Sequence, residues 1–347
     1  MTEQSTSRRT NGSDVEGGHR ATIGVDLRGR VFAGREFRGV SLAGCDLRRG
    51  SLHGARFVEC DLRGVNLSYA SAANATFVDC DLTTAVILGA DLRETTFRGS
   101  SLTRADLRTS DLHGTDVGTA DLAEANLSLC DLSETNFEGA ALVKACLSRA
   151  KLHRANLTAA NLSEATLFEA DLTDAILLKT NLVSATGPAA LFLRTRLDGA
   201  NAKLADFSDS QFSEAVTTLT IFERAALTRV RMDQVSADEA IFDFSDLSGA
   251  RFEQSRFVGA SLVGARLAGA YAKASSFSSA DFYWAEMDEF TLVGSTIFDA
   301  RLPEKPSIAF GPRRLHPPAI GRMPLHRAAA TPDERTRLLD ALRSIPS

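Results

Sequence analysis

The sequence predicts an all-β solenoid built from four-sided coils, and two observations carry that prediction. A bulky apolar residue recurs at every fifth position from Leu27 to Leu302 without a change of register. A period of five matches neither the 3.6 residues of a helix nor the two of a strand, but it suits a chain that turns a corner every five residues. Phenylalanines also recur at intervals of 20 residues, at Phe37, Phe57, Phe77 and Phe97. Four sides of five residues therefore form one coil.

Each five-residue side has two inward and three outward positions. Of the 56 central positions, 50 hold Leu, Phe, Ile, Val or Met, and the residue two before the centre is usually small. These two positions form the interior, while the other three face water. Parallel strands are about 4.8 Å apart, so about 14 coils give a rod about 67 Å long.

The repeat resembles the pentapeptide-repeat family, whose motif is A(D/N)LXX. The motif is visible at Ala90-Asp91-Leu92, Ala105-Asp106-Leu107, Ala120-Asp121-Leu122, Ala125-Asn126-Leu127, Ala155-Asn156-Leu157, Ala160-Asn161-Leu162 and Ala170-Asp171-Leu172. The resemblance covers roughly residues 25–302. It implies a right-handed quadrilateral parallel β-helix, whose open ends need caps because such repeats bury a core only by stacking.

The repeats are expected to form one elongated unit over residues 22–302, with one interruption at residues 186–190. There Gly187 replaces a large central residue and Pro188 follows it. Since proline cannot donate a ladder hydrogen bond and glycine tolerates a kink, we expect a bulge or small loop between a stack over 22–185 and one over 191–302. Such a loop is either a tolerated defect or a partner contact.

The two flanks differ from the repeats. Residues 1–21 are polar and are expected to be disordered, and residues 303–330 are rich in Pro and Arg and are expected to be irregular. A short helix is predicted at about 332–344, because Thr331 and Pro332 form a helix start. Its apolar face contains Leu338, Leu342 and Ile345. The helix either caps its own solenoid or makes a homodimer contact, which several relatives form through C-terminal segments.

Composition favours a cytoplasmic protein, because no segment is apolar enough to span a membrane and no signal-peptide core is present. Cys60 and Cys80 occupy inward positions one coil apart, where we expect free thiols that serve as packing. His53, His113 and His153 follow central residues on one side of the coil, but they lie two or three coils apart and cannot share a zinc ion. We therefore predict a non-enzymatic protein without a metal or cofactor.

Charge is distributed unevenly along the chain. The net charge is −5, and residues 22–302 carry 28 basic and 37 acidic residues. One column, interrupted by Lys151, holds acidic residues 20 or 40 positions apart, and two further carboxylates follow on the neighbouring sides. The predicted acidic site consists of Asp91, Asp111, Asp131 and Asp171, with Asp116 and Asp121. A ladder of like charges repels itself, so it must be well solvated or bind a cationic partner.

The sharpest functional hypothesis follows from the resemblance. Pentapeptide-repeat proteins that modulate type II topoisomerases are similar rods with acidic faces that mimic DNA. Residues 109–178 carry eleven acidic and four basic residues, or about one net charge per 2.4 Å of rod, against about one per 1.7 Å of duplex DNA. The hypothesis is a DNA-mimicking protector of DNA gyrase that confers drug resistance.

The alternative hypothesis is a scaffold or adaptor without DNA mimicry. Outward apolar and aromatic residues on a polar rod suggest an interface with another protein. The predicted apolar patch consists of Val216, Ile221, Ile241, Tyr283 and Trp284. Neither direct nucleic-acid binding nor membrane binding is expected, because no basic groove with interleaved aromatic residues is present.

Overall fold

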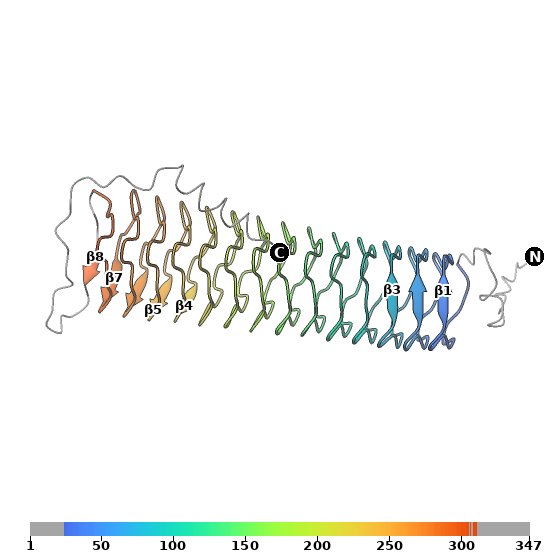
Figure 1. Ribbon diagram of the computed structural model, residues 1–347. Coiled ribbons are helices and arrows are strands. Elements are labelled where there is room, and N and C mark those ends of the chain that lie inside the picture. Colours follow the sequence, from blue (N-terminus) through green and yellow to red (C-terminus); the bar gives the residue numbers. More distant parts are fainter. Residues whose placement is uncertain (1–23, 305, 307, 311–347) are drawn as a thin grey trace, which may run out of the picture.

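The computed structural model describes residues 24–304, 306 and 308–310. Coils of nearly equal size stack side by side into a long rod (Figure 1). The rod is an all-β parallel solenoid of about 14 coils, as predicted, and its described residues contain no helix. The predicted disorder over 1–21 and the predicted helix over 332–344 lie outside the described residues.

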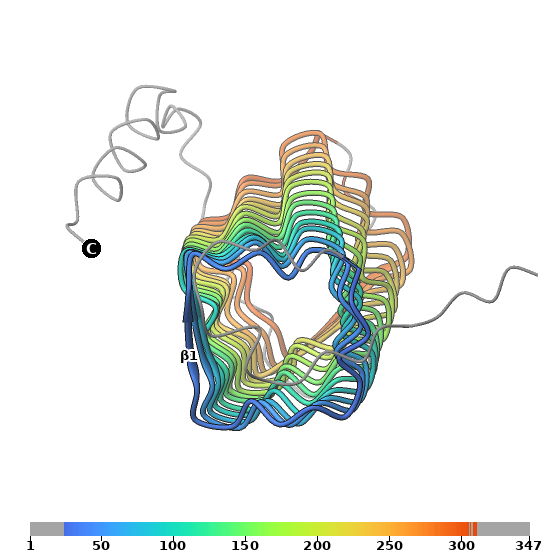
Figure 2. The same cartoon turned by 90° about the vertical axis from the view of Figure 1, so that its right-hand side faces the viewer.

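Each coil has four sides, and Figure 2 shows the open quadrilateral traced by the backbone when the rod is viewed along its length. Coil 1 starts at residue 25. We call its sides face A (residues 25–29), face B (30–34), face C (35–39) and face D (40–44), and equivalent residues recur 20 positions later. Isolated bridges such as Asp26 with Asp46 and Ser41 with Asp61 set this register.

Backbone hydrogen bonds connect each coil to the next and close most corners. The N–H of Leu27 donates to the carbonyl of Asp46 in the next coil (2.8 Å), and the N–H of Arg30 donates to the carbonyl of Leu27 across the corner (3.2 Å). The fifth residue of each side has a positive φ, as at Arg49 (58°). This combination is typical of a type II turn, so the five-residue period is a repeated turn.

The described residues contain eight short strands. Strands β1 (Glu36–Arg38), β2 (Arg56–Val58) and β3 (Thr76–Val78) form a parallel sheet on face C at the N-terminal end. The second parallel sheet lies mainly on face B at the other end and consists of β4 (Arg231–Asp233), β5 (Arg251–Glu253), β6 (Tyr271–Lys273), β7 (Phe290–Val293) and β8 (Ile308–Phe310).

Strand β8 corrects the prediction that residues 303–330 are irregular throughout. Ile308 pairs with Phe290 and Phe310 pairs with Leu292. These partners are 18 residues apart, whereas the regular bridges join residues 20 apart. The five-residue period ends at Leu302, so periodicity could not reveal a strand in a shortened last coil.

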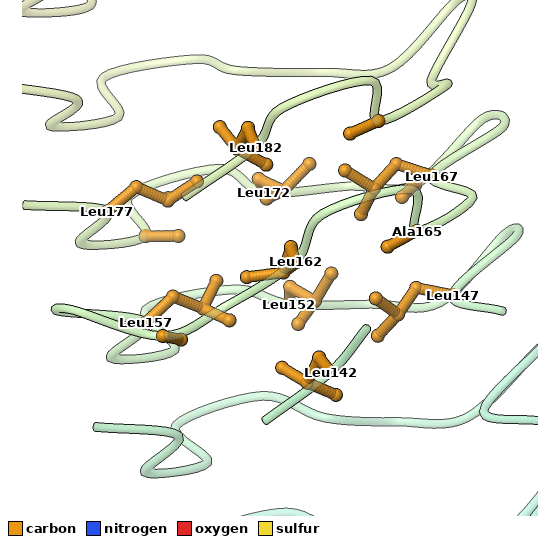
Figure 3. Packing of buried hydrophobic residues seen from close by; sticks show 14 of the residues in the cluster. Leu142, Leu147, Leu152, Leu157, Leu162, Ala165, Leu167, Leu172, Leu177 and Leu182 are labelled. Carbon is orange, nitrogen blue, oxygen red and sulfur yellow. The ribbon is translucent and has the colours of Figure 1, made fainter. Parts of the chain in front are cut away.

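The core is a continuous column of central residues. The coil over residues 145–164 points four leucines inward, Leu147, Leu152, Leu157 and Leu162, as Figure 3 shows. The side chains of all four are fully buried. Apolar burial of this kind is the main stabilising term in folding, and every coil repeats it.

Aromatic columns confirm the predicted coil length of 20 residues. Phe37, Phe57, Phe77 and Phe97 stack in turn with ring centroids 4.9, 5.0 and 5.0 Å apart. Phe222 and Phe242 form a second stack at 5.1 Å. Such alignment requires that residues 20 apart lie directly above one another.

The bulge predicted at residues 186–190 is absent. Gly187 keeps the ladder, since its N–H donates to the carbonyl of Asp206 (2.7 Å). A Cβ atom at Gly187 would lie 2.9 Å from Leu167 and 3.2 Å from the ring of Phe207. Glycine is therefore needed here because these large neighbours above and below fill its space.

Pro188 fits the regular coil for a different reason. It occupies the fourth position of its five-residue side. A backbone N–H at this position donates to the side chain two residues earlier and not to the next coil. Ser208, one coil later, shows this bond, because its N–H donates to Oδ1 of Asp206 (3.0 Å). The missing N–H of proline thus removes no ladder bond.

Candidate functional site

The six predicted acidic residues share one structural role. Each stands at the second position of a side, and its Oδ1 accepts a hydrogen bond from the N–H two residues later, as Asp111 does from His113 (3.1 Å). The same bond is made by Asp91, Asp116, Asp121, Asp131 and Asp171. These side chains satisfy a backbone donor that the coil leaves unpaired, so the fold itself explains an Asp or Asn here.

Cations within the chain accompany the acidic column on face B. Arg93 contacts both Asp91 (2.8 Å) and Asp111 (3.6 Å). Its hydrogen bond lowers the pKa of Asp91 below the ordinary value. The Nζ of Lys151 is 3.8 Å from Asp131. Cations of the same and neighbouring coils thus partly compensate the acidic column.

The acidic charge is greatest on face B, which carries seven acidic and three basic residues over 91–178, and the other faces carry the rest. Asp111, Asp116 and Asp121 are one side apart, so they lie on faces B, C and D. Residues 91–178 carry 14 acidic and eight basic residues. That net −6 corresponds to about one charge per 3.5 Å of rod, half the density of duplex DNA or less.

A column of large apolar side chains lies on face D in the C-terminal half. Leu204, Phe244 and Trp284 occupy equivalent fifth positions, each two coils from the next. Their side chains are 49%, 52% and 65% exposed. Arg224 and Gly264 occupy the same position in the two coils between them, so the column is interrupted. Water-exposed apolar residues are common singly, but several on one face indicate an interaction surface.

Further apolar residues extend this column across face D. Ile221 and Ile241 pair directly as neighbours in successive coils, and the rings of Tyr283 and Trp284 stack with centroids 4.5 Å apart. We define the face-D patch as Leu204, Ile221, Ile241, Phe244, Val263, Tyr283 and Trp284. Val216, also predicted as part of the patch, lies on neighbouring face C.

The fold does not require the three exposed members of the column. Leu204, Phe244 and Trp284 have φ angles of 60°, 58° and 61°. Bulky side chains are disfavoured in this left-handed region, where Gly, Asn and Asp are enriched. The positions therefore combine local strain with exposure, a combination that stability alone does not favour.

Exposed apolar residues elsewhere form no comparable column. On face A, Tyr69 and Leu129 are three coils apart, whereas the exposed residues of face D are two coils apart. Phe168 lies under the guanidinium of Arg149, which is 5.7 Å from the ring centroid, and Tyr283 of the face-D patch lies under that of Arg301 at 3.8 Å. Face D thus carries the more extensive apolar surface.

The thiols divide into a buried and a partly exposed group. Burial raises the pKa of Cys130 to about 12. Burial also acts to raise the pKa of Cys146, but hydrogen bonds from Ser128, Ser148 and Thr166 outweigh it and lower that pKa to about 7. Cys146 occupies an outward position on face A, so it is the more reactive of the two thiols.

No catalytic constellation is evident in the part of the chain that the structure describes. His53 and His113 border a shallow depression of about 520 Å³ on face B, together with Asp91 and Arg93. Residues 24–304, 306 and 308–310 contain no group of three or more His, Cys, Asp or Glu placed to hold a metal ion. Within the same residues, no helix is long and apolar enough to cross a membrane.

Family models match most of the solenoid. A model described as "Pentapeptide repeat region" matches residues 31–107. A second, "Pentapeptide repeats (8 copies)", matches 110–149, 150–186, 222–254 and 255–292. The chain belongs to the pentapeptide-repeat family. No curated protein matches this pentapeptide-repeat protein.

Solved structures of other pentapeptide-repeat proteins are similar in parts. HetL, involved in heterocyst differentiation regulation in the cyanobacterium Nostoc sp. strain PCC 7120, is 27% identical, with 77% of this chain and 89% of HetL covered and a TM-score of 0.24. QnrB1, a plasmid-mediated fluoroquinolone resistance protein, is 17% identical, with 62% and 90% covered and a TM-score of 0.33. Rfr23 from the cyanobacterium Cyanothece 51142 is 31% identical, with 32% and 86% covered and a TM-score of 0.29. At these TM-scores none of the alignments supports a functional assignment.

The structure brings together four of the five predicted apolar residues and adds others. Ile221, Ile241, Tyr283 and Trp284 all lie on face D. Leu204 and Phe244 were missed because they are 40 positions apart and each stands at the fifth position of a side, which the periodic pattern of inward residues does not mark. The signal that finds them is the 20-residue register, applied to the fifth position of every side.

Proposed function

We propose that this pentapeptide-repeat protein is a non-catalytic rod that binds another protein through the face-D patch. The supporting observation is the column of Leu204, Phe244 and Trp284, which are exposed in strained backbone positions where the fold favours small or polar residues. Aromatic anchors of this kind dominate protein interfaces. The rod then serves as a rigid scaffold that presents one face.

Capture of the partner from a lysate of the source cells tests this proposal. Full-length chain is immobilised as the native protein, as Phe244→Asp/Trp284→Asp, and as the control Tyr69→Asp/Leu129→Asp, which adds the same charge at exposed positions of face A. We expect a protein that the native chain and the control retain and the face-D variant loses. Retention should change little with salt, because apolar contacts are not screened. Equal retention by all three chains would contradict the proposal.

The second candidate is a DNA-mimicking modulator of a type II topoisomerase, DNA gyrase, that confers drug resistance. It is favoured by the net −6 over residues 91–178 and by Asp121 and Glu138, which form no ion pair within the described part of the chain. Face B carries seven of the 14 acidic residues over 91–178 and three of the eight basic ones, so most of the net charge lies on one side of the rod, as a mimic requires. The charge density, half that of duplex DNA or less, argues against this candidate.

Gyrase supercoiling, with and without a fluoroquinolone, separates the two candidates. The native chain is titrated beside the variant Asp91→Asn/Asp111→Asn/Asp131→Asn, in which each amide oxygen still accepts the backbone hydrogen bond. Inhibition or drug protection that the triple variant loses would support the mimic. No effect at large molar excess would exclude it for gyrase and leave the face-D patch as the contact surface.

A further inference from the structure

The face-D patch is close to the end of the described chain, and a long segment follows. Strand β8 ends at Phe310, and 37 residues, 311–347, come after it. We propose that residues 331–345 dock on the face-D patch as an amphipathic helix and cover it. The patch would then be closed in the free protein, and a partner would have to displace this segment.

The sequence of the segment suits an apolar groove or face. Leu338, Leu342 and Ile345 are spaced to share one side of a helix. Thr331 and Pro332 provide the helix start. A helix of this length is marginal alone in water and gains most of its stability by burying its apolar face. The segment therefore needs a surface of the kind that face D offers.

The spacing of the two surfaces matches. Adjacent coils are about 5 Å apart, as the stacked rings of Phe222 and Phe242 show (5.1 Å). Phe244 and Trp284, two coils apart, are thus separated by about 10 Å along the rod. Leu338 and Ile345 are seven residues apart, or about 10.5 Å along a helix. A helix parallel to the rod can therefore place both residues against this column in register.

Charge also favours docking in this region. Residues 206–301 carry 15 acidic and eight basic residues, whereas residues 303–347 carry four acidic and eight basic. Asp288 and Glu289 are close in sequence to Trp284 and form no ion pair within the described residues. The basic excess lies in residues 303–330, which carry one acidic and five basic residues, whereas residues 331–345 carry three of each. The carboxylates of Asp288 and Glu289 thus attract the connecting chain toward the region of the patch, and the docking of residues 331–345 itself rests on their apolar face.

The connecting chain is long enough for this contact. Residues 311–330 can extend about 66 Å. The patch reaches over four coils from Leu204 to Trp284, about 19 Å along the rod. Reach therefore places no limit on which part of the patch the helix covers.

Trp284 provides a direct test because it is the chain's single tryptophan. Acrylamide quenching of its fluorescence is measured in the native full-length chain, in Leu338→Asp/Leu342→Asp, and in Thr336→Asp/Ser344→Asp. The last variant adds the same charge on the opposite side of the predicted helix. All substitutions lie outside the repeats, and circular dichroism checks that the β-solenoid is retained.

We expect the Leu338→Asp/Leu342→Asp variant to lose protection, with a higher quenching constant and an emission maximum at longer wavelength, while the control matches the native chain. Equal quenching in all three chains would overturn the inference. Native protection that disappears on dilution would also overturn it, because a second copy would then cover the patch. The inference concerns the same patch as the proposed function, but it needs no partner, so each can fail without the other.

Discussion

The acidic coils over residues 105–184 and the C-terminal coils over 185–284 share one backbone and differ in what their outward positions do. In the acidic coils, Asp111 and Asp131 bond to their own turns and contact cations of neighbouring coils. On face D of the C-terminal coils, Phe244 and Trp284 are exposed in left-handed backbone positions. The comparison teaches that an acidic residue in this fold is a poor sign of function, whereas several exposed apolar residues gathered on one face are a stronger one.

The largest effect on the free energy of unfolding is expected for substitutions in the core, where the two regions are alike. Leu157→Ala in the acidic coils and Phe242→Ala in the C-terminal coils should each lower the free energy of unfolding, by about 2–5 and 3–5 kcal/mol, because both side chains are fully buried. Denaturant unfolding followed by circular dichroism measures this. A small loss in one region only would show that the two cores are not equivalent.

Removal of a patch side chain, in contrast, should not lower the free energy of unfolding. Leu204→Gly is expected to leave the free energy of unfolding unchanged or raise it by up to about 1 kcal/mol, because relief of the left-handed strain offsets the greater freedom of glycine when unfolded. The same denaturant titration applies. A loss of more than about 2 kcal/mol would mean that the side chain supports the fold, and the argument for function would fail.

A smaller effect separates the two roles of an acidic residue. Asp111→Asn keeps the oxygen that accepts the N–H of His113, so the free energy of unfolding should stay nearly constant. Asp111→Ala leaves that donor without its partner and should lower the value by about 1 kcal/mol. Thermal unfolding of both variants makes the comparison. Equal losses in the two would show that charge, and not the hydrogen bond, explains the residue.

The smallest expected effect is a difference in reactivity between the thiols of Cys146 and Cys130. Cys146 has a pKa lowered to about 7, whereas burial raises that of Cys130 to about 12. Alkylation of Cys146 in the folded chain should therefore increase as the pH rises through about 7, while Cys130 stays unmodified. Mass spectrometry after brief iodoacetamide treatment at pH 6, 7 and 8 reads both sites. Modification of Cys130 at an equal rate would contradict the assigned inward position.

The fold was predictable because the periodic residues are the ones that determine it. The spacing of Phe37 and Phe57 along the chain is enough to indicate the coil length, and their rings do stack. The effect of Gly187 was not predictable, because its neighbours Leu167 and Phe207 fill its space only in the folded rod. Strand β8 was hidden because its coil is shortened.

The candidate site was only partly predictable, for a reason that the coil makes clear. Ile221 and Ile241 are conspicuous because they are apolar at outward positions that hold polar residues in most sides. Phe244 is not conspicuous until the coil places it between Leu204 and Trp284. The acidic column was predicted by residue, but its counter-charges come from side chains such as Arg93 that the sequence does not assign to a partner.

Site-specific photo-crosslinking in source cells tests the central claim most directly. A photoreactive amino acid replaces Phe244 on face D in one chain and Asp111 in the acidic column on face B in another. The account predicts that the Phe244 position gives a discrete crosslinked protein and that the Asp111 position gives none. A discrete adduct from the Asp111 position, with none from the Phe244 position, would contradict it.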